Sequence, residues 1–259
     1  MSRARLVPAL ARIALAACIA QGTCDAAQPG PALAALRVAS LTERALKLQA
    51  QAGQAILAER SRRALAQAVR DLDAAVRAVG VPASPAELHE SAAILRLLVA
   101  DYRAWTLKAP TRDNARKLGE RAEEIAWEAA KVVRLLGEAG RAPPPLAAKA
   151  ADASALSQRI ARLLLWQRWG IATRSSVNEL ALAKAALRAD LDALRAAPAT
   201  ASEIDSELQV AENQAAFLFA AAYRLDSGAE GARQVDFVAK ASDNMHESLE
   251  RLVSLYAER

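Results

Sequence analysis

Apolar residues recur every three or four positions along most of the chain, which is the spacing of one face of an amphipathic helix. A clear stripe runs through Leu65, Val69, Leu72 and Val76. With prolines and glycines as breaks, this spacing predicts eight helices, over residues 33–57, 60–79, 85–108, 112–138, 147–170, 175–196, 201–225 and 231–257. We expect Gly53 to kink the first helix, because glycine weakens a helix interior by about 1 kcal/mol.

The second half of the chain repeats the first at an offset of 115 residues, so that Arg44 matches Arg159. After a one-residue insertion the offset becomes 116, and Pro82 matches Pro198. Because the chain is rich in alanine and leucine, some self-similarity arises by chance, but matches between arginines and between prolines argue against chance here. A repeat of this length predicts two copies of one structural unit.

Both copies carry a helix-start signature at the same place. Ser84 and Glu87 have the spacing of a capping box with Pro85 at the first helical position, and Thr200 and Glu203 repeat it. In such a box the hydroxyl accepts from a free backbone N–H and the glutamate reaches back to the cap residue. Each half is therefore expected to begin a new helix there.

Three consecutive prolines, Pro143 to Pro145, prohibit a continuous helix and mark the boundary between the halves. Four antiparallel helices joined by short loops make a bundle. The sequence therefore predicts an all-α fold of two tandem four-helix bundles, over residues 32–139 and 147–258, with a proline-rich linker over 140–146.

The composition agrees with helices and excludes several functions. The chain is 53% hydrophobic but only 4% aromatic, and about a quarter of it is alanine, a strong helix former. Two cysteines are too few for a disulfide scaffold or a cysteine-rich zinc module. No basic run with interleaved aromatics supports nucleic-acid binding, and no later segment is apolar for long enough to predict a membrane span.

The first 26 residues have the form of a secretory signal peptide. Three arginines precede a short apolar run, and Cys24 and Ala26 are small residues at the −3 and −1 positions of a cleavage site. We expect cleavage near Ala26 and a periplasmic protein, and the alternative is a lipoprotein attached through Cys18. Cleavage removes both cysteines and lowers the net charge from +5 to +3.

The first helix of the second half carries Leu-Ser-Gln-Arg at residues 156–159, followed by Ile-Ala-Arg. This motif resembles that of the N-terminal periplasmic domain of type IV pili methyl-accepting chemotaxis transducers, to which a domain of nitrate and nitrite sensor kinases is related. The similarity covers about 147–257, and the first half resembles a diverged copy with Leu-Thr-Glu-Arg at 41–44. The resemblance implies a ligand-binding sensor domain. Nitrate sensors bind the anion at a dimer interface through an arginine before the motif, but here Ser154 and Ala39 occupy that position.

The resemblance and the repeat together select five candidate ligand-binding residues on the two first helices: Arg159, Gln158, Ser157, Ser154 and Arg44. A guanidinium donates to a planar anion in a fork, so the two matched arginines could recognise an anion or a partner. The alternative is that each arginine forms an ion pair that stabilises its helix.

The tryptophans allow a second kind of site. Trp166 and Trp169, with Arg162 one turn earlier, could form an aromatic and cationic wall for a ligand. We favour packing, because residues three apart share a helix face. Trp105 and Trp127 are expected in the core of the first half.

His246 with Met245 could suggest a metal or haem ligand pair, but a lone histidine on a polar helix face is the preferred reading. The chain has no haem-attachment motif, no zinc-protease motif, no phosphate loop and no nucleophile elbow. We therefore predict no catalytic residue, no metal site, no cofactor and no enzyme.

The function that we expect is an exported periplasmic sensory or adaptor protein that binds a small ligand, such as an anion, or an envelope signalling protein. A homodimer is one arrangement that the sequence allows. The alternative is a structural or interaction bundle of the cell envelope without a small-molecule ligand.

Overall fold

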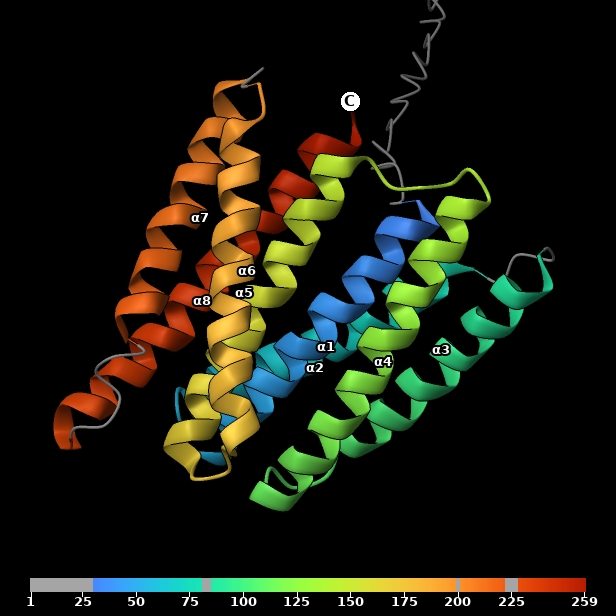
Figure 1. The fold of residues 1–259 in the computed structure, drawn as a ribbon. Helices are drawn as coiled ribbons and strands as arrows, with labels where there is room; N and C mark the ends of the chain where they lie inside the picture. Colours follow the sequence, from blue (N-terminus) through green and yellow to red (C-terminus); the bar gives the residue numbers. More distant parts are fainter. Residues whose placement is uncertain (1–29, 81–84, 199–200, 222–227) are drawn as a thin grey trace, which may run out of the picture.

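The computed structural model describes residues 30–80, 85–198, 201–221 and 228–259. Within these ranges the chain is all-α, with the helices α1 (Pro31–Gly53), α2 (Ala58–Val79), α3 (Ala86–Thr106), α4 (Arg112–Glu138), α5 (Pro145–Trp169), α6 (Arg174–Ala196), α7 (Ser202–Ala221) and α8 (Gly228–Ala257) (Figure 1). All eight predicted helices are present, with ends that differ by a few residues. The predicted signal peptide, with its alternative at Cys18, lies outside the described residues.

Two details of the helix ends differ from prediction. Helix α1 ends at Gly53 and does not continue through a kink, and Ala55 and Leu57 beyond it have a positive φ that no helix continues through. Glycine is required at 53 because a Cβ there would lie 2.3 Å from the Trp169 ring and 2.6 Å from the Pro110 carbonyl oxygen. Helix α3 has Pro85 as its N-cap residue, without a side-chain cap. The hydroxyl residues of both predicted capping boxes, Ser84 and Thr200, lie outside the described residues.

The two halves make the same set of helix contacts. In the first half, α1 packs against α2 and α4, and α3 packs against α4 and more lightly against α2. In the second half, α5 packs in the same way against α6 and α8, and α7 against α8 and more lightly against α6. Helices at matched places in the repeat therefore have matched neighbours.

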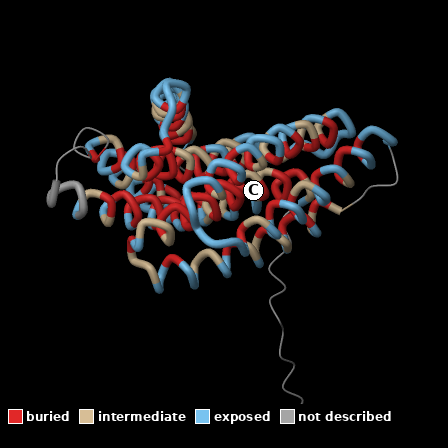
Figure 2. Tube along the Cα trace, turned by 90° about the horizontal axis from the view of Figure 1, so that it is seen from below, coloured by how far each residue is buried: buried red, intermediate tan, exposed pale blue. Residues whose placement is uncertain are grey.

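Helices α1 and α5 also pack against each other, as extensively as α1 packs against α4. Both lie at the centre of the molecule, and the buried residues concentrate along them (Figures 1 and 2). The hydrophobic core is one continuous cluster that includes both halves. The first helix of each copy is thus surrounded by protein on most of its circumference.

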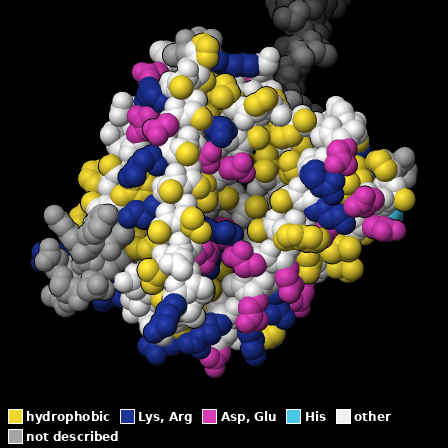
Figure 3. Space-filling model, in the orientation of Figure 1, with side chains coloured by type: hydrophobic (Ala, Val, Ile, Leu, Met, Phe, Trp, Pro, Cys, Tyr) yellow, Lys and Arg dark blue, Asp and Glu magenta, His cyan; other side chains and the backbone are white. Residues whose placement is uncertain are grey.

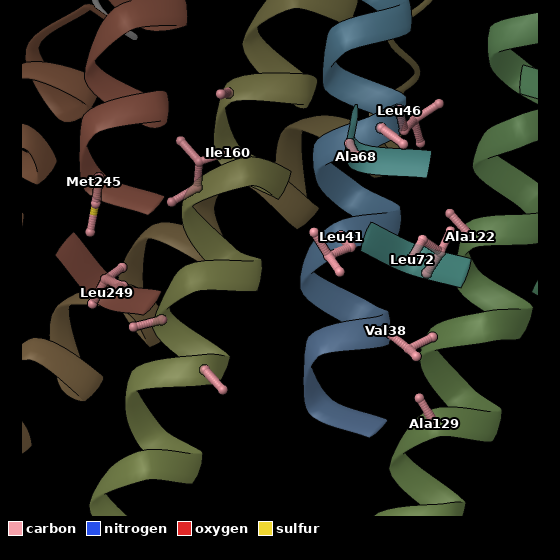
Figure 4. Packing of buried hydrophobic residues seen from close by; sticks show 14 of the residues in the cluster. Val38, Leu41, Leu46, Ala68, Leu72, Ala122, Ala129, Ile160, Met245 and Leu249 are labelled. Atoms are coloured by element: carbon pink, nitrogen blue, oxygen red, sulfur yellow. The ribbon is translucent and has the colours of Figure 1, made fainter. Parts of the chain in front are cut away.

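Small and branched apolar residues fill the space around these two central helices. Val38 and Leu41 of α1 face Leu72 of α2 and the alanines of α4, while Ile160 of α5 lies beside Met245 of α8 (Figure 4). Full burial of one leucine or isoleucine side chain is worth about 1.5–3 kcal/mol. Alanine is small and lets the helices approach closely, which explains why the chain is rich in alanine.

None of the described helices combines the length and the apolar content that crossing a bilayer requires.

A polar seam between α1 and α5 as candidate ligand site

The interface between α1 and α5, here called the seam, contains polar side chains at positions that the repeat matches. Ser40 Oγ of α1 lies 3.0 Å from Ser154 Oγ of α5, and both side chains are fully buried. At the offset of 115, Ser154 matches Ala39, the neighbour of Ser40. The two first helices therefore meet through the same part of their surfaces, as two copies of one protomer do at a two-fold interface.

On one side of the seam, Glu43 of α1 holds two arginines of α5. Its Oε1 accepts from Arg159 Nε at 2.8 Å, and its Oε2 accepts from Arg162 Nε at 2.9 Å. Glu179 of α6 accepts from Arg162 Nη2 at 2.9 Å, and Glu123 of α4 lies 3.5 Å from Arg159 Nη2. These five residues form the Glu43 cluster, in which three carboxylates face two guanidinium groups.

Aromatic side chains close the Glu43 cluster. The guanidinium of Arg162 lies over the Trp166 ring, 4.6 Å from its centre, and the same ring fills the space above Gly119 of α4. Tyr102 donates to the Thr42 carbonyl oxygen at 2.9 Å, and burial raises the pKa of this phenol well above its usual value. Trp166 is 8% exposed, so the expected packing role holds and it lines no open ligand wall.

On the other side of the seam, Lys47 of α1 reaches α8. Its Nζ donates to Asp243 Oδ1 at 2.6 Å and to Ser242 Oγ at 3.1 Å. Arg60 of α2 lies 3.5 Å from the second oxygen of Asp243. Burial lowers the pKa of Lys47, against the raising effect of Asp243.

His246 of α8 lies on the same side of the seam as Lys47. Its Nδ1 is 2.8 Å from Ser154 Oγ, and its side chain is buried. Burial lowers its pKa well below the usual value, and the charges of Arg44, Lys47 and Arg37 lower it further. A neutral imidazole is therefore favoured at neutral pH, and the preferred reading of His246 as a residue on a polar face is wrong.

Glu250 of α8 completes this side of the seam. Arg37 Nε of α1 lies 2.9 Å from its Oε2, while burial raises the pKa of the carboxyl group. Together with Gln158, these side chains form the His246 cluster, which consists of Arg37, Arg44, Lys47, Arg60, Ser154, Gln158, Ser242, Asp243, His246 and Glu250.

Two groups of the His246 cluster have no partner. Arg44 forms no hydrogen bond or ion pair with any residue that the structure describes, although its Nε is buried. Gln158 donates from Nε2 to the Ser242 carbonyl oxygen at 2.7 Å, but its buried Oε1 accepts nothing from the described residues. Unpaired buried polar atoms cost free energy, typically about 1–3 kcal/mol each.

The structure divides the five predicted ligand residues between the two sides of the seam. Ser154 and Gln158 belong to the His246 cluster, and Ser157 Oγ lies beside them, donating to the Ser154 carbonyl oxygen at 2.7 Å. Arg44 acts on the charges of the same cluster. Arg159 lies on the other side with Glu43, in a groove between α5 and α6 that Gln158 does not line. Arg159 and Gln158 therefore face different sides of α5.

Sequence reasoning missed two of the most strongly buried charges of the seam, Glu43 and Lys47, and named Arg162 only as part of a possible ligand wall. Glu43, Lys47 and Arg162 have side chains only 0–4% exposed. A signal was available, because Lys47 matches Arg162 at the offset of 115, so both copies place a cation on the same turn of the first helix. Trp127, expected in the core, is 67% exposed.

The clusters carry mixed charge on both sides of the seam, and the space-filling view shows acidic and basic side chains close together near the middle of one face (Figure 3).

The described residues contain no group of three or more His, Cys, Asp or Glu that could hold a metal ion. Comparisons with family models, with curated proteins and with solved structures find no match for this chain. The described part of the chain therefore belongs to the class of all-α proteins.

Proposed function

We propose that this chain is exported to the periplasm and works there as a non-catalytic sensory or adaptor module. In this proposal the two halves are four-helix bundles, paired through α1 and α5, and a small ligand or an envelope partner acts at the seam. The proposal is supported by the signal-like N-terminus, by the resemblance to chemotaxis-transducer sensor domains, and by the matched helix contacts of the two halves.

One observation carries the proposal. The charged residues of α1 and α5 are buried at the seam and paired with groups from α4, α6 and α8. Buried ion pairs depend strongly on geometry, because desolvation is repaid only when the partners are well placed. A ligand that shifts one first helix therefore changes the packing of the other, which is a direct route for a signal between the halves.

The proposal does not include nitrate binding through an arginine before the motif. Ser154, which stands at that position, is committed to Ser40 and His246. A serine hydroxyl cannot supply the forked donors of a guanidinium.

The test measures whether a ligand changes the arrangement of the halves. Spin labels at Ala100 of α3 and Ala216 of α7, both exposed, report the distance between them. The labelled protein, with Cys18 and Cys24 replaced by serine where they remain, is first screened for thermal stabilisation by nitrate, nitrite, sulfate, acetate and neutral amino acids. A compound that raises Tm is expected to change the distance distribution. A screen without any stabilising compound would contradict the ligand-binding role.

Export has its own test. The full chain, expressed in a Gram-negative host, is expected in the periplasmic fraction with an N-terminus at Ala27. Recovery of the uncleaved chain with the cytoplasmic fraction would contradict this part of the proposal.

A second candidate function is docking to an envelope protein without a small ligand. It is favoured by exposed apolar side chains on α3 and α4, where Ile94, Leu97 and Trp127 are 43%, 72% and 67% exposed. Aromatic residues are enriched among the anchors of protein interfaces. For this candidate, Trp127→Ala removes recruitment of the envelope partner and leaves the ligand screen unchanged.

A further inference from the structure

The two sides of the seam are built from matched residues but differ at one of them. The repeat matches Arg159 with Arg44, Arg162 with Lys47, and Glu43 with Gln158. In the Glu43 cluster the carboxylate of Glu43 binds both cations of α5. In the His246 cluster its counterpart is the neutral amide of Gln158.

The counterparts still approach one another. Gln158 Nε2 and Lys47 Nζ both bind Ser242 of α8, through its carbonyl oxygen at 2.7 Å and its hydroxyl at 3.1 Å. They are the matched pair of Glu43 and Arg162, which bind each other directly. The matched positions therefore meet on both sides of the seam, and the carboxylate is missing from one.

The cations on this side lack part of their counter-charge. Arg37, Arg44, Lys47 and Arg60 face two carboxylates, Asp243 and Glu250, and His246 is buried beside them. Lys47 and Arg60 pair with Asp243 and Arg37 pairs with Glu250, whereas Arg44 acts on Glu250 through its charge alone and forms no ion pair with any described residue. The Nε of Arg44 is buried and has no acceptor among the described residues, so Arg44 can still bind an anion.

We infer that the His246 cluster binds a small carboxylate, which pairs with Arg44 as the carboxylate of Glu43 pairs with Arg159 on the other side of the seam. This inference rests on the proposed ligand-binding function and assigns its site and its ligand class. A guanidinium donates two parallel hydrogen bonds to a planar carboxylate, and a singly charged carboxylate costs less to desolvate at this partly buried place than a doubly charged anion.

Arg44 is only partly buried, whereas Gln158, Ser154 and His246 of the same cluster are fully or almost fully buried. A ligand therefore reaches Arg44 from the surface of the seam. A small carboxylate meets this requirement, and acetate is the simplest probe.

The experiment follows the methyl NMR signal of acetate during titration with the full protein, at constant ionic strength in chloride. Two variants remove the site by different means. Arg44→Gln removes the guanidinium, and Gln158→Glu supplies a built-in carboxylate that competes for it. Arg116→Gln, on the exposed surface of α4, is the matched control for the loss of one arginine.

We expect acetate to bind equally to the wild type and to the Arg116→Gln control. We expect it to bind to both site variants at least tenfold more weakly. Gln158→Glu loses the donor to the Ser242 carbonyl oxygen, so circular dichroism and a thermal melt must show that this variant is folded at the temperature of the titration. Equal binding by wild type and Arg44→Gln, or stronger binding of sulfate than of acetate, overturns the assignment. If acetate fails to bind while another compound of the thermal screen stabilises the protein, the site assignment is wrong and the proposed function stands.

Discussion

The Glu43 cluster and the His246 cluster are two versions of one arrangement. Both lie where α1 meets α5, and matched positions of the repeat build them. In the first, Glu43 satisfies Arg159 and Arg162, and Arg162 is only 2% exposed. In the second, Gln158 leaves Arg44 without an acceptor. The comparison contrasts a carboxylate that pairs with two arginines with an amide at the matched position that forms no hydrogen bond with Arg44.

The difference also concerns stability. A buried pair contributes little net free energy, but removal of one partner is costly because a buried charge remains. The Glu43 cluster is therefore sensitive to loss of its carboxylate. The His246 cluster already lacks that carboxylate, so the protein tolerates the cost there, as functional sites commonly do.

The largest expected effect follows from Glu43→Gln. This change leaves Arg162 buried with only Glu179 and Glu123 near it, and we expect a loss of about 3–5 kcal/mol in the free energy of unfolding. Urea denaturation followed by circular dichroism measures it. The matched variant is Gln158→Glu, which we expect to lose less, because the new carboxylate faces cations although it gives up the hydrogen bond to the Ser242 carbonyl oxygen. Similar losses in both variants would remove the distinction between the clusters.

The next effect concerns the packing that closes the Glu43 cluster. A Cβ at Gly119 would lie 2.4 Å from the Trp166 ring, whereas one at Gly137 of the same helix would lie 3.8 Å from Ala142. Gly119→Ala should cost about 1–3 kcal/mol through overpacking, while Gly137→Ala should stabilise by up to about 1 kcal/mol through helix propensity. Thermal melts of the two variants decide it, and equal melting temperatures would show that Trp166 moves freely.

His246 should give the protein a stability that depends on pH. The pKa of His246 is lower in the folded state than in the unfolded chain, where it is about 6.5. Its stabilising contribution is therefore complete above pH 6.5 and decreases as the pH falls below that value, by at most about 1.4 kcal/mol per pH unit.

Glu250 has the opposite effect, because its raised folded pKa favours the folded state at low pH. The His246 contribution is therefore isolated by comparing the wild type with His246→Gln in urea titrations between pH 7.5 and 5.5. The variant should show a weaker loss of stability on acidification. An identical pH dependence in both proteins would mean that His246 titrates normally.

The smallest effect belongs to ion pairs on the surface. Arg116 and Asp113, 3.0 Å apart and 50% and 83% exposed, should contribute less than about 0.5 kcal/mol, because solvent screens their attraction. Arg116→Gln tests this in the same urea assay. A loss above 1 kcal/mol would show that burial does not decide the value of charge pairs in this protein.

Apolar spacing alone predicted all eight helices, and prolines and glycines gave most of their ends. The repeat predicted the correspondence of α1 with α5, but not that the two would pack against each other, because a repeat carries no information about contacts between its copies. His246 was misread since its neighbours in sequence, Asn244 and Glu247, are exposed, while its burial comes from α1 and α5. Trp127 was predicted to be buried but is exposed. Aromatic residues usually lie in a core, and nothing in the neighbouring sequence distinguishes this one.

The candidate site was predicted in part for a similar physical reason. Gln158 and Ser154 were selected from the motif, and both belong to the His246 cluster. Arg159 was selected with them because it is adjacent in sequence, yet one step along a helix turns a side chain by about 100°, which places Arg159 on the other side of α5. Only the structure shows that Glu43 already occupies its guanidinium.

The central claim, that residue type at one matched position decides which side of the seam is open, is tested most directly by exchanging the two residues. The double variant Glu43→Gln, Gln158→Glu conserves the charge of the seam and moves the carboxylate from one cluster to the other. Acetate binding by the exchanged protein is compared with that of the wild type, with and without Arg44→Gln. The account predicts at least tenfold weaker binding after the exchange, because the moved carboxylate pairs with Arg44 while Arg159 keeps Glu123 and Glu179 as partners. Binding as tight as in the wild type, or binding that still depends on Arg44, would contradict it.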